Sequence, residues 1–242
     1  MKKRKVLLIL IIIMFIFSIG LIYFINSSYK PLENNDNYLK NEFVVEHDIY
    51  YEFKHNNSND KSFIFYPGGR VDERVYAPLA YLLSERGYPV YLVKMPLDLA
   101  VLGIDRAQII IDQYNKKNQK WYLIGHSLGG AMAGSYIYNN FDNLTSVKGL
   151  ILLASYVSEE TNLLDQTIDV LSITATEDKI LNWGKYESSK NNLPSDTVYN
   201  SIEGGNHSGF GNYGPQKGDG QSLISKQKQW EKTVHLIIKF IN

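Results

Sequence analysis

The chain begins with one long apolar stretch. Residues 6–25 carry no charge, and a helix of twenty residues spans about 30 Å, the thickness of the hydrocarbon core of a bilayer. Lys2, Lys3, Arg4 and Lys5 precede it and favour the cytoplasmic side. The pattern predicts an N-terminal cytoplasmic basic cluster and transmembrane anchor over residues 1–25, which would make this a single-pass cell-membrane protein with everything beyond residue 25 extracytoplasmic. The alternative is a secreted protein whose signal is cleaved near residues 18–20.

Behind this stretch the pattern changes twice. Residues 26–41 are polar, contain Pro31 and show little periodicity, which predicts a juxtamembrane linker before a single domain over residues 42–242. Between residues 43 and 53, apolar side chains alternate with mostly polar ones. This alternation is typical of antiparallel strands that have one solvated face.

From residue 62 onward, short continuous apolar runs alternate with helical patterns. We expect strands at 62–66, 90–93, 121–124, 149–153, 170–174 and 197–202, and helices over 76–86, 105–117, 128–138 and 180–192. A closing helix has an apolar face of Trp230, Val234, Ile237, Ile238 and Ile241. This order predicts an α/β fold with a mostly parallel, doubly wound sheet that helices cover on both faces. Functional sites of such sheets form beyond the carboxyl ends of the strands.

Composition narrows the chemistry. The formal net charge is zero, which argues against nucleic acid as a partner. Because the chain has no cysteine, disulfides, thiolate metal sites and a cysteine nucleophile are excluded. The five histidines form no H-E-x-x-H arrangement, so no metal signature is present in the sequence.

The sequence Gly125-His126-Ser127-Leu128-Gly129 lies between a predicted buried strand and a predicted helix rich in small residues. A G-x-S-x-G sequence occurs by chance in about one chain in ten of this length, so the strand before it and the helix after it carry the argument. They are the context of a nucleophile elbow, in which the two glycines remove Cβ atoms that would collide in the sharp turn. The elbow would expose the hydroxyl of Ser127 and leave the Leu128 amide free at a helix N-terminus, where it can stabilise an oxyanion.

A serine nucleophile needs a base and an acid that orients the base. Asp178 follows the strand at 170–174 and is the expected acid, with Glu177 as the alternate; a helix N-cap is the competing role for Asp178. His207 follows the strand at 197–202 in a glycine-rich loop and is the expected base. The order Ser, Asp, His is that of α/β-hydrolases.

The other four histidines are weaker candidates for the base. His47 lies in an early antiparallel strand, His55 in a turn and His235 on the closing helix. His126 adjoins the serine, but the turn should direct its side chain away from the hydroxyl, so we expect a structural role.

The second oxyanion donor should come from the turn after the strand at 62–66. Gly69, in Pro67-Gly68-Gly69-Arg70, is the expected donor, and Arg70 is next. Arg70 could equally contact substrate or be an ordinary salt-bridged loop residue.

Several segments of the chain resemble those of a known family. The turn 66–69, the segment 94–97, the elbow at 125–129 and Gly205-Asn206-His207 with the trailing residues 211–214 are similar to the compact α/β-hydrolase fold-5 family, which is related to dienelactone hydrolase-like enzymes. The resemblance covers residues 43–242. It implies a lidless α/β-hydrolase with a Ser127–Asp178–His207 triad. The short interval between Ser127 and Asp178 also leaves no room for an inserted helical lid. This chain carries serine where a relative of dienelactone hydrolase can carry cysteine, so that enzyme's substrate is not carried over.

The sequence therefore predicts a membrane-anchored serine hydrolase, similar to a carboxylesterase, that cleaves an ester or related acyl bond of a small molecule through an acyl-enzyme. No metal or organic cofactor is implied. Two alternatives stay open: a peptidase or amidase that uses the same triad, and a non-catalytic binding protein that keeps the fold.

Overall fold

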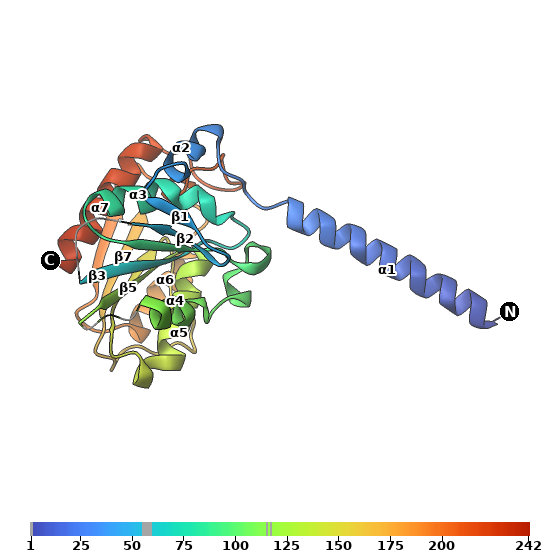
Figure 1. Cartoon of the computed structure of the whole chain (residues 1–242), viewed down its shortest axis with the longest axis horizontal. Helices are drawn as coiled ribbons and strands as arrows, with labels where there is room; N and C mark the ends of the chain where they lie inside the picture. The colour runs from blue at the N-terminus through green and yellow to red at the C-terminus, as the bar shows by residue number, and fades with distance from the viewer. Residues whose placement is uncertain (1, 55–59, 115, 117) are drawn as a thin grey trace.

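Eight strands form one sheet at the centre of the chain (Figure 1). The computed structural model describes residues 2–54, 60–114, 116 and 118–242, so His55 lies outside the described residues. The order across the sheet is β1-β2-β4-β3-β5-β6-β7-β8. The strands are β1 Val44–Glu46, β2 Tyr50–Phe53, β3 Lys61–Tyr66, β4 Val90–Val93, β5 Lys120–His126, β6 Val147–Leu153, β7 Asp169–Ala175 and β8 Val198–Ile202.

The pairing is mostly parallel, as the sequence predicted. The pairs β1/β2 and β2/β4 are antiparallel, and all pairs from β4 through β3 to β8 are parallel. One expectation for the antiparallel strands was wrong, because all four residues of β2 are buried and it has no solvated face. Phe53 packs into the hydrophobic cluster on one side of the sheet and Tyr50 into the cluster on the other.

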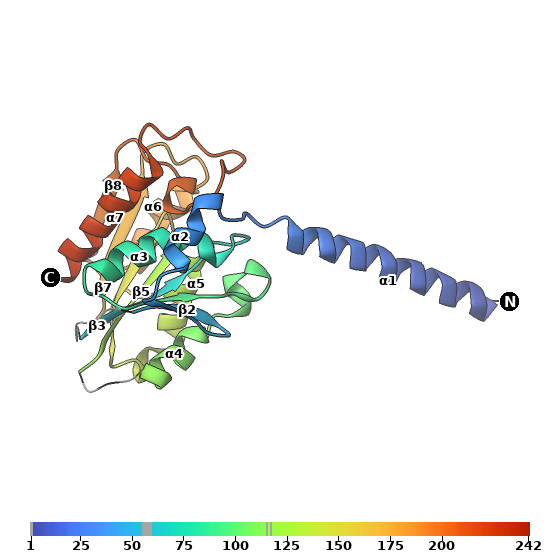
Figure 2. The same cartoon turned by 45° about the horizontal axis from the view of Figure 1, so that its top comes forward.

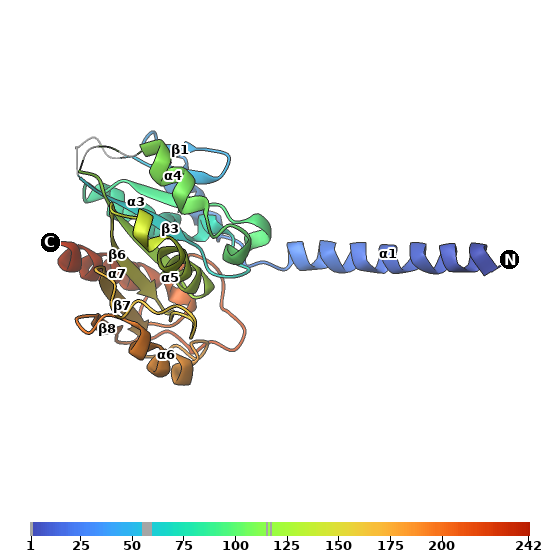
Figure 3. The ribbon, with the colours of Figure 1, turned by 90° about the horizontal axis from the view of Figure 1, so that it is seen from below.

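Helices cover both faces of the sheet, as Figures 2 and 3 show from two sides. On one face lie α3 Ala77–Glu85 and α7 Lys226–Ile241, whose apolar residues share a cluster with Phe63 and Phe65. On the other lie α4 Arg106–Tyr114 and α5 Leu128–Asn140, packed on Ile64 and Leu123. The remaining helices are α1 Lys2–Asn26, α2 Asp36–Leu39, α6 Trp183–Ser189 and the short 3-10 turns η1 Glu33–Asn35, η2 Glu73–Tyr76, η3 Pro96–Asp98, η4 Ala100–Leu102, η5 Phe141–Asn143, η6 Lys190–Asn192 and η7 Ser208–Phe210.

The helix expected over residues 180–192 begins later than its apolar pattern suggested. The backbone N–H groups of Ile180 and Leu181 both donate to Asp178 Oδ1, so residues 178–181 form a turn. Asn182 then caps α6 through the N–H of Lys185. Residues 154–168, which join β6 to β7, contain no helix.

The first helix corrects a sequence prediction. Figure 1 shows α1 projecting away from the sheet, with its described side chains largely exposed. Among the residues that the structure describes, no helix is both long and apolar enough to cross a membrane. The predicted transmembrane anchor over residues 6–25, the membrane as a partner and the single-pass localisation are therefore wrong.

The polar segment after α1 lies against the domain. Asn35 is fully buried, donates from Nδ2 to the carbonyl oxygen of Arg74 and accepts from Asn212 Nδ2. Tyr38 packs edge-on against Tyr81 and Trp230. The sequence indicated none of these contacts, because a polar segment can satisfy its hydrogen bonds with protein as well as with water.

Candidate active site

Ser127 occupies a sharp turn between β5 and α5. Its backbone has φ 51° and ψ −124°, a conformation that non-glycine residues rarely adopt. Two glycines make the turn possible. A Cβ on Gly125 would lie 2.4 Å from backbone atoms of Gly130, and a Cβ on Gly129 would lie 2.3 Å from the carbonyl oxygens of Tyr66 and Pro67. The carbonyl oxygen of Ser127 accepts a 2.6 Å bond from Ser155 Oγ, which helps to fix the turn.

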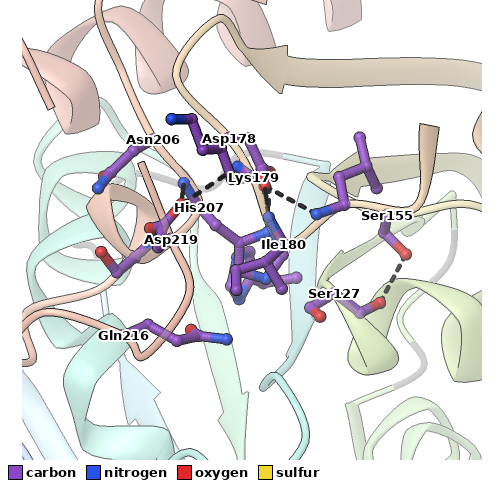
Figure 4. Close-up of polar contacts among 12 residues, drawn as sticks. Ser127, Ser155, Asp178, Lys179, Ile180, Asn206, His207, Gln216 and Asp219 are labelled. Atoms are coloured by element: carbon purple, nitrogen blue, oxygen red, sulfur yellow. Dashed lines mark hydrogen bonds and ion pairs between the residues drawn. The ribbon is translucent and has the colours of Figure 1, made fainter. Parts of the chain in front are cut away.

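Asp178 and His207 meet at the carboxyl ends of β7 and β8. His207 Nδ1 lies 2.8 Å from Asp178 Oδ2, and both side chains are almost completely buried (Figure 4). Asp178 Oδ1 accepts the N–H groups of Ile180 and Leu181 at 2.8 Å each. The carboxylate therefore performs both roles weighed for it, organising a turn with one oxygen and contacting His207 with the other.

Two residues that the sequence analysis missed hold the loop of His207. Asp219 Oδ1 accepts the backbone N–H of His207 at 3.3 Å, and Asp219 Oδ2 accepts that of Ser208 at 2.8 Å. Lys226, at the start of α7, donates to the carbonyl oxygens of Ser208 and Gly211. Burial lowers the pKa of Lys226 to about 8. The sequence Gly218-Asp219-Gly220 resembles any surface turn, so no local signal pointed to Asp219.

His126 packs against the ring of His207. Its ring lies 4.5 Å, between centroids, from the ring of His207, and its Nδ1 lies 2.7 Å from Tyr76 Oη. Burial, with a smaller contribution from His207, lowers the pKa of His126 well below its ordinary value, so the ring is neutral. His126 directs its Nδ1 to a tyrosine and has the structural position expected for it. The contribution of Tyr76, ten residues after β3, had no signal in the sequence.

The turn after β3 brings Gly69 beside Leu128. A Cβ on Gly69 would lie 2.8 Å from Leu128 Cδ2 and 3.3 Å from Leu128 Cβ, so the two backbones run close together. Within the described residues, neither the N–H of Gly69 nor that of Leu128 donates to a protein acceptor. The N–H of Gly68 donates to Tyr76 Oη, and the N–H of Arg70 donates to the carbonyl oxygen of Asp98.

The side chain of Arg70 contacts the N-terminal segment. Its guanidinium lies 4.2 Å from the ring centroid of Phe24 and donates to the carbonyl oxygen of Phe24 and to Ser27 Oγ. The side chain thus contacts the end of α1 and the residue that follows it, through hydrogen bonds and a cation–π contact.

A cavity of about 400 Å³ opens at the same edge of the sheet. Its lining combines the elbow, the loop after β6 and the turn after β7. The residues are Ser127, Leu128, Ala131, Met132, Ala154, Ser155, Tyr156, Ser158, Ile180, Leu181, Asn182 and His207. Ser127 and His207 thus face one space whose other walls are largely apolar.

The competing candidates lie elsewhere. Glu177 Oε1 accepts from Thr176 Oγ1, and no contact joins it to His207 within the described residues. His47 contacts Glu52 and stacks on Tyr50 near the opposite edge of the sheet, and His235 is exposed on α7. Over the described ranges, no group of three or more His, Asp or Glu side chains could hold a metal ion.

Comparison with known proteins agrees with this architecture. Residues 62–231 match the model of the alpha/beta hydrolase family. The chain belongs to the alpha/beta hydrolase family. Among solved structures, carboxyl esterase 2 from Tuber melanosporum superimposes with a TM-score of 0.61 at 13% identity, covering 87% of this chain and 89% of that one. Dienelactone hydrolase from Anabaena variabilis gives a TM-score of 0.60 at 10% identity, covering 82% of this chain and 99% of that one.

One curated relative is similar in sequence to this chain over a shorter region. Protein phosphatase methylesterase 1 from Debaryomyces hansenii is 35% identical over 88 residues, which are 35% of this chain. The chain spans 22% of the length of that relative. Family membership and the structural neighbours establish the alpha/beta hydrolase fold of this chain.

Proposed function

We propose that this chain is a serine hydrolase that cleaves the ester bond of a small carboxylic ester, with Ser127 as nucleophile, His207 as general base and Asp178 as the acid that orients the base. The observation that carries the proposal is the 2.8 Å contact between His207 Nδ1 and Asp178 Oδ2, beside a cavity that Ser127 and His207 both line. The esterases among the structural neighbours and the methylesterase relative favour an ester over an amide.

The mechanism depends on which ring nitrogen of His207 is bonded to Asp178. With Nδ1–H donated to Asp178, Nε2 of His207 is the nitrogen that accepts a proton from Ser127 Oγ. Oγ then attacks the carbonyl carbon, and the N–H groups of Gly69 and Leu128 stabilise the oxyanion. His207 returns the proton to the departing alcohol, leaving an acyl-enzyme on Ser127. A water molecule, deprotonated by His207, attacks the acyl-enzyme and releases the acid, and the proton on His207 returns to Ser127.

A fluorophosphonate probe tests the nucleophile. The probe should add covalently to Ser127, as seen by intact mass and peptide mapping, and Ser127→Ala should abolish labelling and lower the hydrolysis of p-nitrophenyl butyrate on the order of 10⁶-fold. Ser158→Ala is the matched control, because Ser158 lines the same cavity but bonds to Thr161. Labelling or hydrolysis that survives in the Ser127→Ala protein would overturn the proposal.

Substitutions of two neighbouring carboxylates, Asp178 and Glu177, test which of them orients His207. Asp178→Asn keeps the shape of the side chain but removes the charge that faces His207 and allows the wrong histidine tautomer, so kcat should fall on the order of 10⁴-fold. Glu177→Gln, one residue away and bonded to Thr176, should leave kcat within about twofold. A loss in the Glu177 variant in place of the Asp178 variant would reassign the acid.

A further inference from the structure

The six residues 27–32, which we call the strap, cross the loops that carry the proposed oxyanion donor Gly69 and the proposed base (Figure 2 shows the chain between α1 and α2). The strap pairs with the turn after β3 through backbone bonds. The N–H of Tyr29 donates to the carbonyl oxygen of Arg70 at 2.9 Å, and the N–H of Asp72 donates to the carbonyl oxygen of Tyr29 at 3.0 Å. The turn therefore gains a short parallel bridge centred on Val71.

The same segment contacts the loop that follows His207. The N–H of Leu32 donates to the carbonyl oxygen of Asn212 at 3.0 Å, and Tyr29 Oη accepts the N–H of Lys217 at 3.1 Å. The rings of Tyr29 and Tyr213 lie 5.3 Å apart between centroids. Tyr29 thus contacts both loops, the turn through its backbone and the histidine loop through its side chain.

The bond to Arg70 matters because Gly69 lies immediately before that residue. On one side of Gly69, the N–H of Gly68 is fixed by Tyr76 Oη at 3.1 Å. On the other side, Arg70 is fixed at both ends of its backbone, its N–H by Asp98 and its carbonyl oxygen by Tyr29. Arg70 has φ 59°, a strained conformation for a non-glycine residue that persists only where surrounding bonds impose it.

We propose that Tyr29 is a positioning residue of the active site, whose backbone N–H fixes the strained Arg70 and thereby aims the Gly69 N–H at the oxyanion. The inference rests on the proposed function, in which Gly69 is an oxyanion donor. Lys30 reinforces the same turn, since its Nζ lies 3.4 Å from Asp72 Oδ2 and 3.5 Å from Asp98 Oδ2. A segment that precedes the whole catalytic domain in the sequence is in this way part of its oxyanion site.

The experiment compares Tyr29→Pro with Tyr29→Ala in the full chain. Both variants lose the ring, but only proline also loses the N–H that donates to Arg70. We expect kcat for p-nitrophenyl butyrate to be three- to tenfold lower in Tyr29→Pro than in Tyr29→Ala, the loss that one backbone hydrogen bond supports, with KM changed less than twofold. Affinity for a boronic acid, which forms a tetrahedral adduct with the serine and fills the oxyanion site, should fall by the same factor as kcat.

Tyr38→Ala is the matched control, because Tyr38 packs on Tyr81 and Trp230 and not on either loop. It should lower the melting temperature and leave kcat per labelled site unchanged. Equal kcat in the proline and alanine variants, or a loss of kcat without loss of boronic acid affinity, would overturn the inference.

If Tyr29→Pro does not fold, the backbone N–H of Tyr29 is replaced by an ester oxygen through semisynthesis, which keeps the tyrosine ring and removes only the donor to Arg70. We expect the same three- to tenfold loss of kcat relative to the wild-type chain. An unchanged kcat in the ester variant would then overturn the inference. Failure of the wild-type chain to react with a fluorophosphonate would instead overturn the proposed function.

Discussion

At the scale of single residues, two side chains near the turn that carries Gly69 have shifted pKa values, His126 a lowered one and Glu73 a raised one. Neutral His126 lies against His207 and places no positive charge beside that ring. Glu73, at the start of η2, lies close to two other carboxylates. Burial, followed by the charges of Asp72 and Asp98, raises the pKa of Glu73 to about 7. The turn that carries Gly69 therefore lies next to a carboxyl group that changes its charge near neutral pH.

The raised pKa of Glu73 predicts a pH-dependent stability. The unfolded chain releases this proton near pH 4.5 and the folded chain near pH 7, so the stability that the protonated group contributes is fully present below about pH 4.5 and is lost as pH rises through 7. Glu73→Gln, which stays neutral, should raise the free energy of unfolding at pH 8 by up to about 3 kcal/mol and change it little at pH 4.5.

Chemical denaturation at the two pH values measures this difference. Glu33→Gln, at an exposed glutamate, is the matched control and should show no such dependence. A Glu73→Gln protein that is equally stabilised at both pH values would contradict the assigned pKa.

At the scale of elements, the site depends on how closely the β5–α5 turn approaches β3. Parallel pairing sets Tyr66 of β3 beside Gly125 of β5, so both strands end at the same level. Gly129 then passes within contact of the carbonyl oxygens of Tyr66 and Pro67. This approach brings the N-terminus of α5 beside the turn that carries Gly69.

A methyl group at residue 129 should disrupt that approach. In Gly129→Ala the new Cβ would lie 2.3 Å from two backbone oxygens, which cannot move without displacing the end of β3. Overpacking of this kind costs about 1–3 kcal/mol or more, so the melting temperature should fall by about 5–10 °C, as measured by differential scanning calorimetry. Gly214→Ala is the control, because a Cβ there meets nothing within 4 Å. Equal melting temperatures for the two variants would contradict the packing argument.

At the scale of the whole molecule, the site collects residues from distant parts of the chain at one edge of the sheet. Ser127 follows β5, Asp178 follows β7, His207 follows β8, and the strap comes from before β1. The apolar walls of the cavity come from α5, from the loop after β6 and from the turn after β7. Its volume of about 400 Å³ lies at the small end of ligand pockets, which suits a short or medium acyl chain.

This volume predicts a chain-length profile. Each methylene group buried in the cavity contributes about 0.8 kcal/mol, so kcat/KM for p-nitrophenyl esters should rise up to about fourfold per added carbon and level off once the cavity is full. Met132→Trp should move this limit to shorter chains and Met132→Ala to longer ones, because Met132 lines the cavity. Steady-state kinetics on a series from acetate to dodecanoate measures it. If neither substitution changes the chain length at which kcat/KM levels off, the acyl chain binds outside this cavity.

The sequence by itself determined the parallel sheet and most of its strands, because continuous apolar runs recur at the spacing of β/α units and that periodicity is local. It also selected Ser127, Asp178 and His207, since each follows a strand end that parallel pairing brings to one edge of the sheet. Whether these three residues form a catalytic triad remains a prediction for the experiments above.

Only the tertiary structure decided the contacts that join distant segments. The bonds from Asp219 to the loop of His207 and from Tyr29 to Arg70 depend on how loops fold over the sheet, and polar loop residues carry no periodic pattern. The apolar pattern predicted a helix from residue 180, but the N–H groups of Ile180 and Leu181 donate to Asp178, and α6 therefore begins later. The transmembrane prediction over residues 6–25 was wrong, because the described helices include none that is long and apolar enough to cross a membrane. Local periodicity thus fixes the elements, and long-range packing decides which polar groups meet.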